Sequence, residues 1–150
     1  MADGGDRVGH GPAPAKEPEW AGWQSWIGDG FEDRTGPFYF REEPDGSIRC
    51  AFRAGPLHMN GGGNMHGGCM LTFADYALFM IGNNAMENGN GVTVSLNGEF
   101  VGPAVIGDLV EATGEVVRAG GSLIFMRGMI RVGERAVMSF SGVVKKTKRG

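Results

Sequence analysis

Cysteine is scarce in this chain, and long apolar runs are missing from it. The two cysteines, Cys50 and Cys69, cannot build a disulfide framework, so we expect a reducing, cytoplasmic compartment. No uninterrupted apolar segment reaches the roughly 20 residues that a membrane-spanning helix requires. Met1 to Lys16 also lacks the apolar stretch of a secretion signal. The sequence therefore predicts no membrane partner and no export.

A large excess of one charge is missing as well, because 14 Lys and Arg stand against 17 Asp and Glu, for a net charge of −3. Proteins that bind nucleic acid usually carry a basic surplus, so we expect no nucleic-acid partner. The three histidines, His10, His58 and His66, have no cysteine or carboxylate at metal-ligand spacing. Phosphate-loop, dinucleotide and Gly-x-Ser-x-Gly motifs are also absent from the sequence. These absences argue against a metal centre, a nucleotide loop and a serine-hydrolase elbow.

Alternating apolar and polar residues predict strands on both sides of one long helix. The 150 residues suffice for one domain with a substantial core. Two strands, near 38–41 and 48–53, should form a hairpin with one face in water. The last three strands, 108–118, 122–132 and 135–146, have short connections and should form an antiparallel meander. The expected fold class is α+β, with a sheet wrapped around one long central helix.

The first strand after the helix shows the clearest alternation. We expect its core face to consist of Val92, Val94 and Leu96, and its polar face of Thr93, Ser95 and Asn97. Thr93 should therefore point away from the apolar side of the strand.

Three segments divide the chain: a disordered tail over 1–19, a Trp-rich N-terminal helical segment over 20–35, and the main domain over 36–150. In the second segment Trp20, Trp23 and Ile27 fall at helical spacing, which predicts a short helix. Aromatic stripes usually belong to a core, so we favour a lid packed on the sheet. The alternative is an aromatic wall for a ligand.

The most informative stretch is a glycine-rich loop that begins at Asn60 and runs into an apolar helix ending near Ile81. One apolar stripe follows that helix at i, i+3, i+4, i+7, i+8 and i+11, and consists of Met70, Phe73, Ala74, Ala77, Leu78 and Ile81. The opposite face is hardly more polar, so we expect the helix to be buried. Only Asp75, about 140° around the helix from Met70, interrupts its apolar surface. Burying that carboxylate without partners would be costly.

These residues could form an acyl-transfer site. The backbone N–H of Gly67, at the positive end of the helix dipole, can hold the oxygen of a polarised carbonyl. Asn60 can donate its amide to the same oxygen, and Asp75 can act as a general base or attack the carbonyl itself. Thr93 could fix the attacking water.

Each residue also has a purely structural explanation. The glycines could serve close packing, His66 could cap the loop, and Asp75 could be a satisfied carboxylate at a dimer seam. Cys69 offers a rival chemistry, because a thiolate at a helix N-terminus is stabilised. A small cysteine in an apolar helix is more often a packing residue, so we rank the thiol below the carboxylate.

Taken together, these residues resemble a known family. His66-Gly67-Gly68, followed by Asp75 nine residues after the histidine, is similar to the signature of PaaI-type hotdog-fold acyl-CoA thioesterases. Asn60 lies six residues before the histidine, where that family commonly has an asparagine, and Thr93 stands where its next strand begins with Ser or Thr. The resemblance extends from about Gly36 to Lys146, over which the strand order also matches.

The resemblance implies an antiparallel sheet around the central helix, two subunits joined into one continuous sheet, and often a dimer of dimers, a homotetramer. It implies hydrolysis of an acyl-CoA thioester to free acid and CoA, without metal or redox cofactor. Asn60 and Gly67 would hold the thioester oxygen, while Asp75 would come from the other subunit. Asn64 could replace Asn60 in the amide role.

Two other functions stay open. The first is a hotdog protein that binds acyl-CoA without hydrolysing it, although the presence of Asp75 favours the enzyme. The second is a hotdog hydratase, which ranks low because its aspartate typically precedes the histidine and here it follows. The acyl group is not identified by the sequence.

Overall fold

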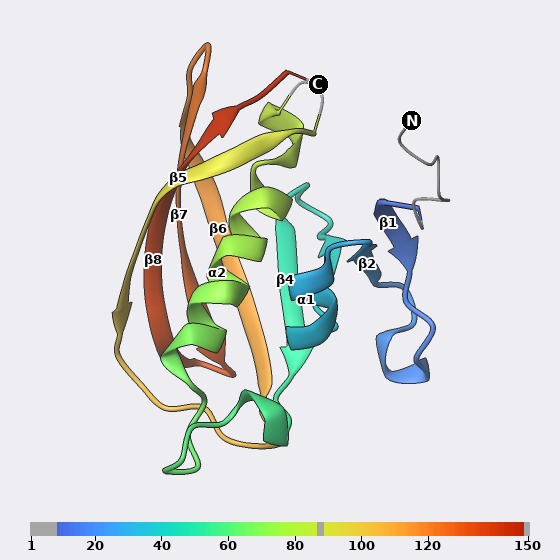
Figure 1. Ribbon diagram of the computed structural model, residues 1–150, viewed down its shortest axis with the longest axis vertical. Helices are drawn as coiled ribbons and strands as arrows, with labels where there is room; N and C mark the ends of the chain where they lie inside the picture. The colour runs from blue at the N-terminus through green and yellow to red at the C-terminus, as the bar shows by residue number, and fades with distance from the viewer. Residues whose placement is uncertain (1–8, 87–88, 149–150) are drawn as a thin grey trace, which may run out of the picture.

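The structure is a computed structural model, and it describes residues 9–86 and 89–148. One antiparallel sheet curves around the long helix α2 (Gly67–Ile81), and a short helix α1 (Gly30–Thr35) lies beside it (Figure 1). The strands are β1 (Gly11–Pro14), β2 (Gln24–Ile27), β3 (Tyr39–Glu42), β4 (Ile48–Arg53), β5 (Gly91–Phe100), β6 (Leu109–Ala119), β7 (Leu123–Val132) and β8 (Arg135–Lys146). Their order in the sheet is β1-β2-β3-β4-β6-β7-β8-β5. The predicted α+β class and the β6-β7-β8 meander are confirmed.

Helix α2 forms because its apolar stripe packs into the concave face of the sheet (Figure 1). Phe73, Ala74, Ala77 and Leu78 are fully buried, as the spacing predicts. The sheet makes room for the helix at Gly142 of β8, where a Cβ would overlap the side chain of Leu78. The expectation that the whole helix is buried is wrong for one flank, which is half-exposed in the single chain and consists of Leu71, Thr72, Asp75 and Phe79.

A bulge overturns the predicted faces of β5. Its register against β8 shifts between Thr93 and Ser95, because Thr93 pairs with Val144 and Ser95 with Val143. Val94 is the extra residue of this bulge, so side chains stop alternating regularly between the two faces of the strand at this point. As a result Thr93 and Leu96 share the helix side of the sheet. Val92 and Val94, expected in the core, are 50% and 52% exposed.

The N-terminal predictions need correction where the structure describes them. Residues 1–8 of the expected tail lie outside the described residues, but Gly11–Pro14 form strand β1 instead of a disordered segment. Within the expected Trp helix, Gln24–Ile27 form strand β2, which pairs with β1. Gly22, with a φ of +88°, ends the 3-10 turn at Pro18–Trp20 before that strand. Pairing with a distant strand is invisible to local helical spacing, which explains the error.

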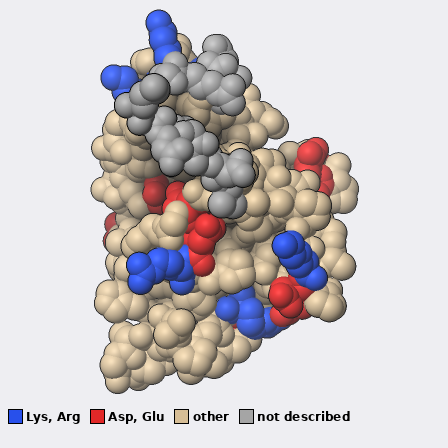
Figure 2. Space-filling model, turned by 45° about the vertical axis from the view of Figure 1, so that its right-hand side comes forward, with Lys and Arg blue, Asp and Glu red and all other residues tan. Residues whose placement is uncertain are grey.

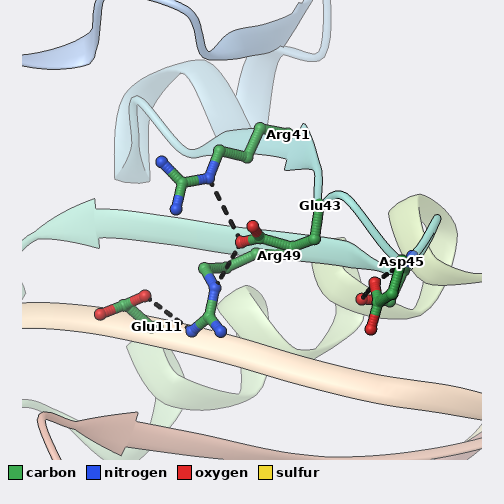
Figure 3. Close-up of polar contacts among 6 residues, drawn as sticks. Arg41, Glu43, Asp45, Arg49 and Glu111 are labelled. Atoms are coloured by element: carbon green, nitrogen blue, oxygen red, sulfur yellow. Dashed lines mark hydrogen bonds and ion pairs between the residues drawn. The ribbon is translucent and has the colours of Figure 1, made fainter.

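The outer face of the β3–β4 hairpin is less exposed to solvent than predicted. Trp20 stacks on Tyr39 with 4.3 Å between ring centroids, and together they bury Ala51. This part of the Trp-rich segment is the lid that the sequence favours. The turn end of the hairpin is polar: Glu43 accepts hydrogen bonds from Arg41 and Arg49, and Arg49 also bonds Glu111 of β6 (Figure 3). These bonds join three neighbouring strands.

Basic and acidic side chains are mixed on the face shown in Figure 2. Among its described residues, that face carries no extended basic surface of the kind that binds nucleic acid. In the described part of the chain, no helix combines the length and apolarity needed to cross a membrane.

Candidate active site

The N-terminus of α2 presents an unused backbone donor. His66 caps the helix, and its Nδ1 accepts a hydrogen bond of 2.8 Å from the N–H of Gly68. Among the described residues, no acceptor reaches the N–H of Gly67, the first residue of the helix. An unpaired N–H at the positive end of a helix dipole suits a negative oxygen.

His66 is therefore the cap that its structural explanation predicted, and it also faces solvent. Because Nδ1 accepts from Gly68, the proton of the neutral ring lies on Nε2. A Cβ on Gly68 would lie 3.0 Å from the imidazole, which is why a glycine stands at this position. The pair of glycines thus serves the cap on one side and leaves the Gly67 N–H open on the other.

Asn60 is oriented by its own loop. Its side-chain Oδ1 accepts hydrogen bonds from the N–H groups of Gly62 and Asn64, at 2.9 and 3.2 Å. With the carbonyl end held in this way, the amide NH₂ points away from those two donors and stays available to a ligand oxygen. Asn64 uses its backbone to close the same loop, with 2.7 Å between its carbonyl oxygen and the N–H of Asn60.

Asp75 and Thr93 meet on the half-exposed flank of α2. The hydroxyl of Thr93 donates a hydrogen bond of 2.6 Å to Oδ1 of Asp75. The bulge in β5 makes this contact, because it turns Thr93 toward the helix. The sequence predicts both residues, but not that one binds the other.

The predicted residues thus form two groups in one chain. His66 and Gly67 lie at the start of α2, with Asn60 in the loop before it, whereas Asp75 lies eight residues after Gly67 and binds Thr93 of β5. At 1.5 Å per residue the two groups are separated by about 12 Å along the helix axis. One carbonyl group cannot touch both groups within a single chain.

Cys69, the rival nucleophile, lies just inside the helix with only 8% of its surface exposed. Burial raises the pKa of its thiol to about 11. A reactive thiolate needs the opposite shift, so Cys69 is suited to packing.

Comparison with known proteins shows the family of the chain. The sequence model of the thioesterase superfamily matches residues 62–139, which include α2, strands β5, β6 and β7 and the start of β8. The chain belongs to the thioesterase superfamily. A candidate esterase of Pseudomonas aeruginosa is 35% identical over 112 residues, 74% of this chain and 84% of the relative. Human acyl-coenzyme A thioesterase 13 is 27% identical over 95 residues, 63% of this chain and 68% of the relative.

Solved structures of similar proteins have the same architecture. The phenylacetic acid degradation protein PaaI of Thermus thermophilus, solved as a mutant, has a TM-score of 0.69 at 24% identity, covering 79% of this chain and all of its own. A Bacillus halodurans protein crystallised with CoA has a TM-score of 0.67 at 26% identity, covering 74% of each chain. This thioesterase-superfamily chain therefore has the hotdog fold, and its resemblance to PaaI-type proteins is confirmed.

Two cavities meet at Asp75 in this superfamily member. One, of about 420 Å³, extends toward Trp26, Phe79 and Met80. The other, of about 470 Å³, extends toward Phe31, Leu71 and Leu96. Trp26 of the Trp-rich segment therefore lines one of these cavities, and its role as a wall for a ligand stays a prediction.

Four residues line both cavities: Asp29, Glu32, Asp75 and Thr93. Sequence reasoning missed Asp29 and Glu32. Asp29 is the N-cap of α1, and its carboxylate accepts from the N–H groups of Phe31 and Glu32. An aspartate followed three residues later by a glutamate is a helix-start signal that could have placed α1. The position of α1 beside Asp75, however, depends on long-range packing.

Burial, as the largest cause, and the negative charges of Asp29, Asp75 and Asp33 together raise the pKa of Glu32 from 4.5 to about 7. A carboxyl group with this pKa is partly protonated at neutral pH. The cavities at Asp75 therefore resist a further negative charge.

Proposed function

We propose that the protein hydrolyses acyl-CoA thioesters to the free acid and CoA, at sites shared between two copies of the chain. The unpaired Gly67 N–H at the start of α2 is the observation that carries this proposal, because acyl transfer needs such a donor. Membership of the thioesterase superfamily supports the reaction class. A relative named acyl-coenzyme A thioesterase and a similar structure holding CoA support the substrate class.

The donor end of the site would bind the thioester oxygen. The N–H of Gly67 and the amide of Asn60 donate to it, and their hydrogen bonds strengthen as the oxygen becomes negative in the tetrahedral intermediate. His66 caps the helix, and its Nε2–H is a further donor on the solvent-exposed side of the site. No metal or redox cofactor takes part in this proposal.

The carboxylate end would supply the base. Thr93 donates to Oδ1 of Asp75, which leaves Oδ2 to accept a proton from water while the Thr93 oxygen accepts the second water hydrogen. The hydroxide oxygen adds to the thioester carbon as Asp75 takes the proton. The C–S bond then breaks, and the departing CoA sulfur takes the proton from Asp75.

Two copies would be needed because of the 12 Å between these ends. Among the described residues β5 pairs only with β8, so its other edge is free to pair with a second β5. Such a pairing would place the Asp75 flank of one chain opposite the α2 N-terminus of its partner. A dimer, or a dimer of dimers, is the assembly we expect.

The test measures free thiol release from a panel of acyl-CoA thioesters. We expect turnover by the wild-type protein, and a loss of about 10² or more for Asp75→Asn, which keeps the size of the side chain but cannot accept the proton. Cys69→Ala is the matched control and should retain most of the activity. Tight acyl-CoA binding without turnover would favour the non-catalytic alternative, and a folded but inactive Cys69→Ala would favour the thiol.

A further inference from the structure

The cavities at Asp75 restrict what can be attached to the scissile carbonyl. If the proposed function holds, the thioester carbon must lie beside Asp75. The acyl group must then leave that point through one of the two cavities, and the pantetheine arm through the other or toward the partner chain. Both routes pass Asp29 and Glu32, because these two carboxyl groups line both cavities.

The carboxyl groups on these routes are not balanced by any lysine or arginine among the described lining residues. Among the described lining residues there are three carboxyl groups, Asp29, Glu32 and Asp75, and no lysine or arginine. The first cavity also contains His10, whose Nε2 accepts a hydrogen bond of 3.2 Å from the indole N–H of Trp26.

The acidic groups act on one another, which shows that water screens them poorly. Burial and the charges of Asp29, Asp33 and Asp75 keep a proton on Glu32 up to about pH 7, where a carboxyl group in water would have lost it. A carboxylate at the far end of an acyl group would enter the same environment. It would meet the same repulsion, with no lysine or arginine lining the described part of either cavity to offset it.

We propose that Glu32 is a specificity-determining residue, which together with Asp29 excludes acyl groups that bear a carboxylate and leaves neutral acyl-CoA thioesters as substrates. This inference rests on the proposed function and adds the chemical class of the acyl group. Asp75 is fixed by the reaction and Asp29 by its role as the cap of α1. Glu32 is the lining carboxyl group without either duty, so its charge can be varied.

The experiment compares acyl groups of similar size, one ending in a carboxylate and the other in a neutral isopropyl group. Glutaryl-CoA and 5-methylhexanoyl-CoA form one such pair, and succinyl-CoA and 4-methylpentanoyl-CoA a shorter one. For wild-type protein we expect kcat/KM to be about tenfold or more higher for the neutral member of a pair. Glu32→Gln should raise kcat/KM for the anionic member about tenfold and change the neutral member by less than about twofold.

Asp33→Asn is the matched control, because it removes the same charge from the same helix but lines neither cavity. At pH 8, where Glu32 is mostly ionised in both proteins, it should leave the ratio of the two substrates close to that of the wild type. Equal rates for the two members of each pair, or an unchanged ratio in Glu32→Gln, would overturn the inference while leaving the thioesterase proposal intact. Failure to hydrolyse any member of the pairs or of the wider panel would instead overturn both.

A second measurement follows the ratio of kcat/KM for the two substrates as the pH changes. Between pH 8 and pH 6 Glu32 gains its proton, whereas the substrate carboxylate, with an ordinary pKa, stays charged. The preference for the neutral member should therefore shrink as the pH falls. Asp29, Asp33, Asp75, Tyr76 and His10 also face this region, and the same pH series with Glu32→Gln, in which the ratio should depend less on pH, separates their contribution from that of Glu32. A ratio independent of pH would contradict the role of Glu32.

Discussion

The hydroxyl of Thr93 donates to Asp75, and its free lone pairs can accept a hydrogen bond from water. Both residues stand out in the sequence, Asp75 as the single carboxylate of an apolar helix and Thr93 as the hydroxyl opening the next strand. Their pairing could not be predicted, because strict alternation turns Thr93 away from the core and only the bulge turns it back. Glu32 was missed for a related reason, since packing alone brings α1 beside Asp75.

Thr93→Val tests the water-binding role of the hydroxyl. Valine keeps the shape and the strand preference but neither donates to Asp75 nor accepts from water. We expect kcat to fall roughly tenfold while KM changes little, because the lost interactions act mainly in the transition state. Thr113→Val, on the outer face of β6, is the control for a threonine-to-valine change in a strand. Unchanged turnover in Thr93→Val would reduce Thr93 to a structural residue.

Glu32 should also make stability depend on pH. Its folded pKa of about 7 lies above the ordinary value of 4.5, so the acid form is favoured in the folded state. The stability that this preference adds is complete below pH 4.5 and is lost as the pH rises through 7. Glu32→Gln should therefore be more stable than wild type at pH 8, by about 1 kcal/mol after allowance for solvent screening, and should lose this advantage toward pH 5.

Urea unfolding of both proteins at pH 5 and pH 8 measures this difference. Asp33→Asn serves as the control, because Asp33 is exposed and has little burial cost to relieve. A Glu32→Gln protein that is less stable than wild type at pH 8 would show that the ionised carboxylate helps the fold.

At the scale of elements, strong local patterns were predictive and long-range pairings were not. The α2 stripe and the β6-β7-β8 meander follow from periodicity and short connections, and both are confirmed. Strand β2 lies in the segment where Trp20, Trp23 and Ile27 fall at helical spacing, yet it is a strand and pairs with β1. No local signal marks that partner, because Gly11–Pro14 belong to a segment rich in glycine and proline.

The packing of α2 against the sheet can be tested at Gly142. A methyl group there would overlap Leu78, at the centre of the helix stripe, and would lie 3.0 Å from the carbonyl oxygen of Ser95. We expect Gly142→Ala to lower the free energy of unfolding by about 1 to 3 kcal/mol. Gly121→Ala, at a loop position with no atom within 4 Å of the added carbon, should be close to neutral. Equal stability of both variants in thermal or urea unfolding would contradict this packing.

At the scale of the whole molecule, a single chain holds both halves of the proposed site but keeps them apart. The N–H of Gly67 lies about 12 Å along α2 from Asp75, Asn60 lies in the loop before the helix, and the flank that carries Asp75 is partly exposed. The edge of β5 beside it offers a place for a second chain among the described residues. Two-fold pairing would form two equivalent sites, each with donors from one chain and the carboxylate from the other.

Complementation between two inactive variants tests this shared site most directly. Asn60→Ala and Asp75→Ala proteins are unfolded and refolded together in equal amounts, and thiol release from the best acyl-CoA is measured. Random pairing makes about half of the dimers mixed, and in each of these one site has both residues intact. We predict that activity returns to about a quarter of wild type. No recovery, in a mixture shown to contain heterodimers, would contradict the shared site.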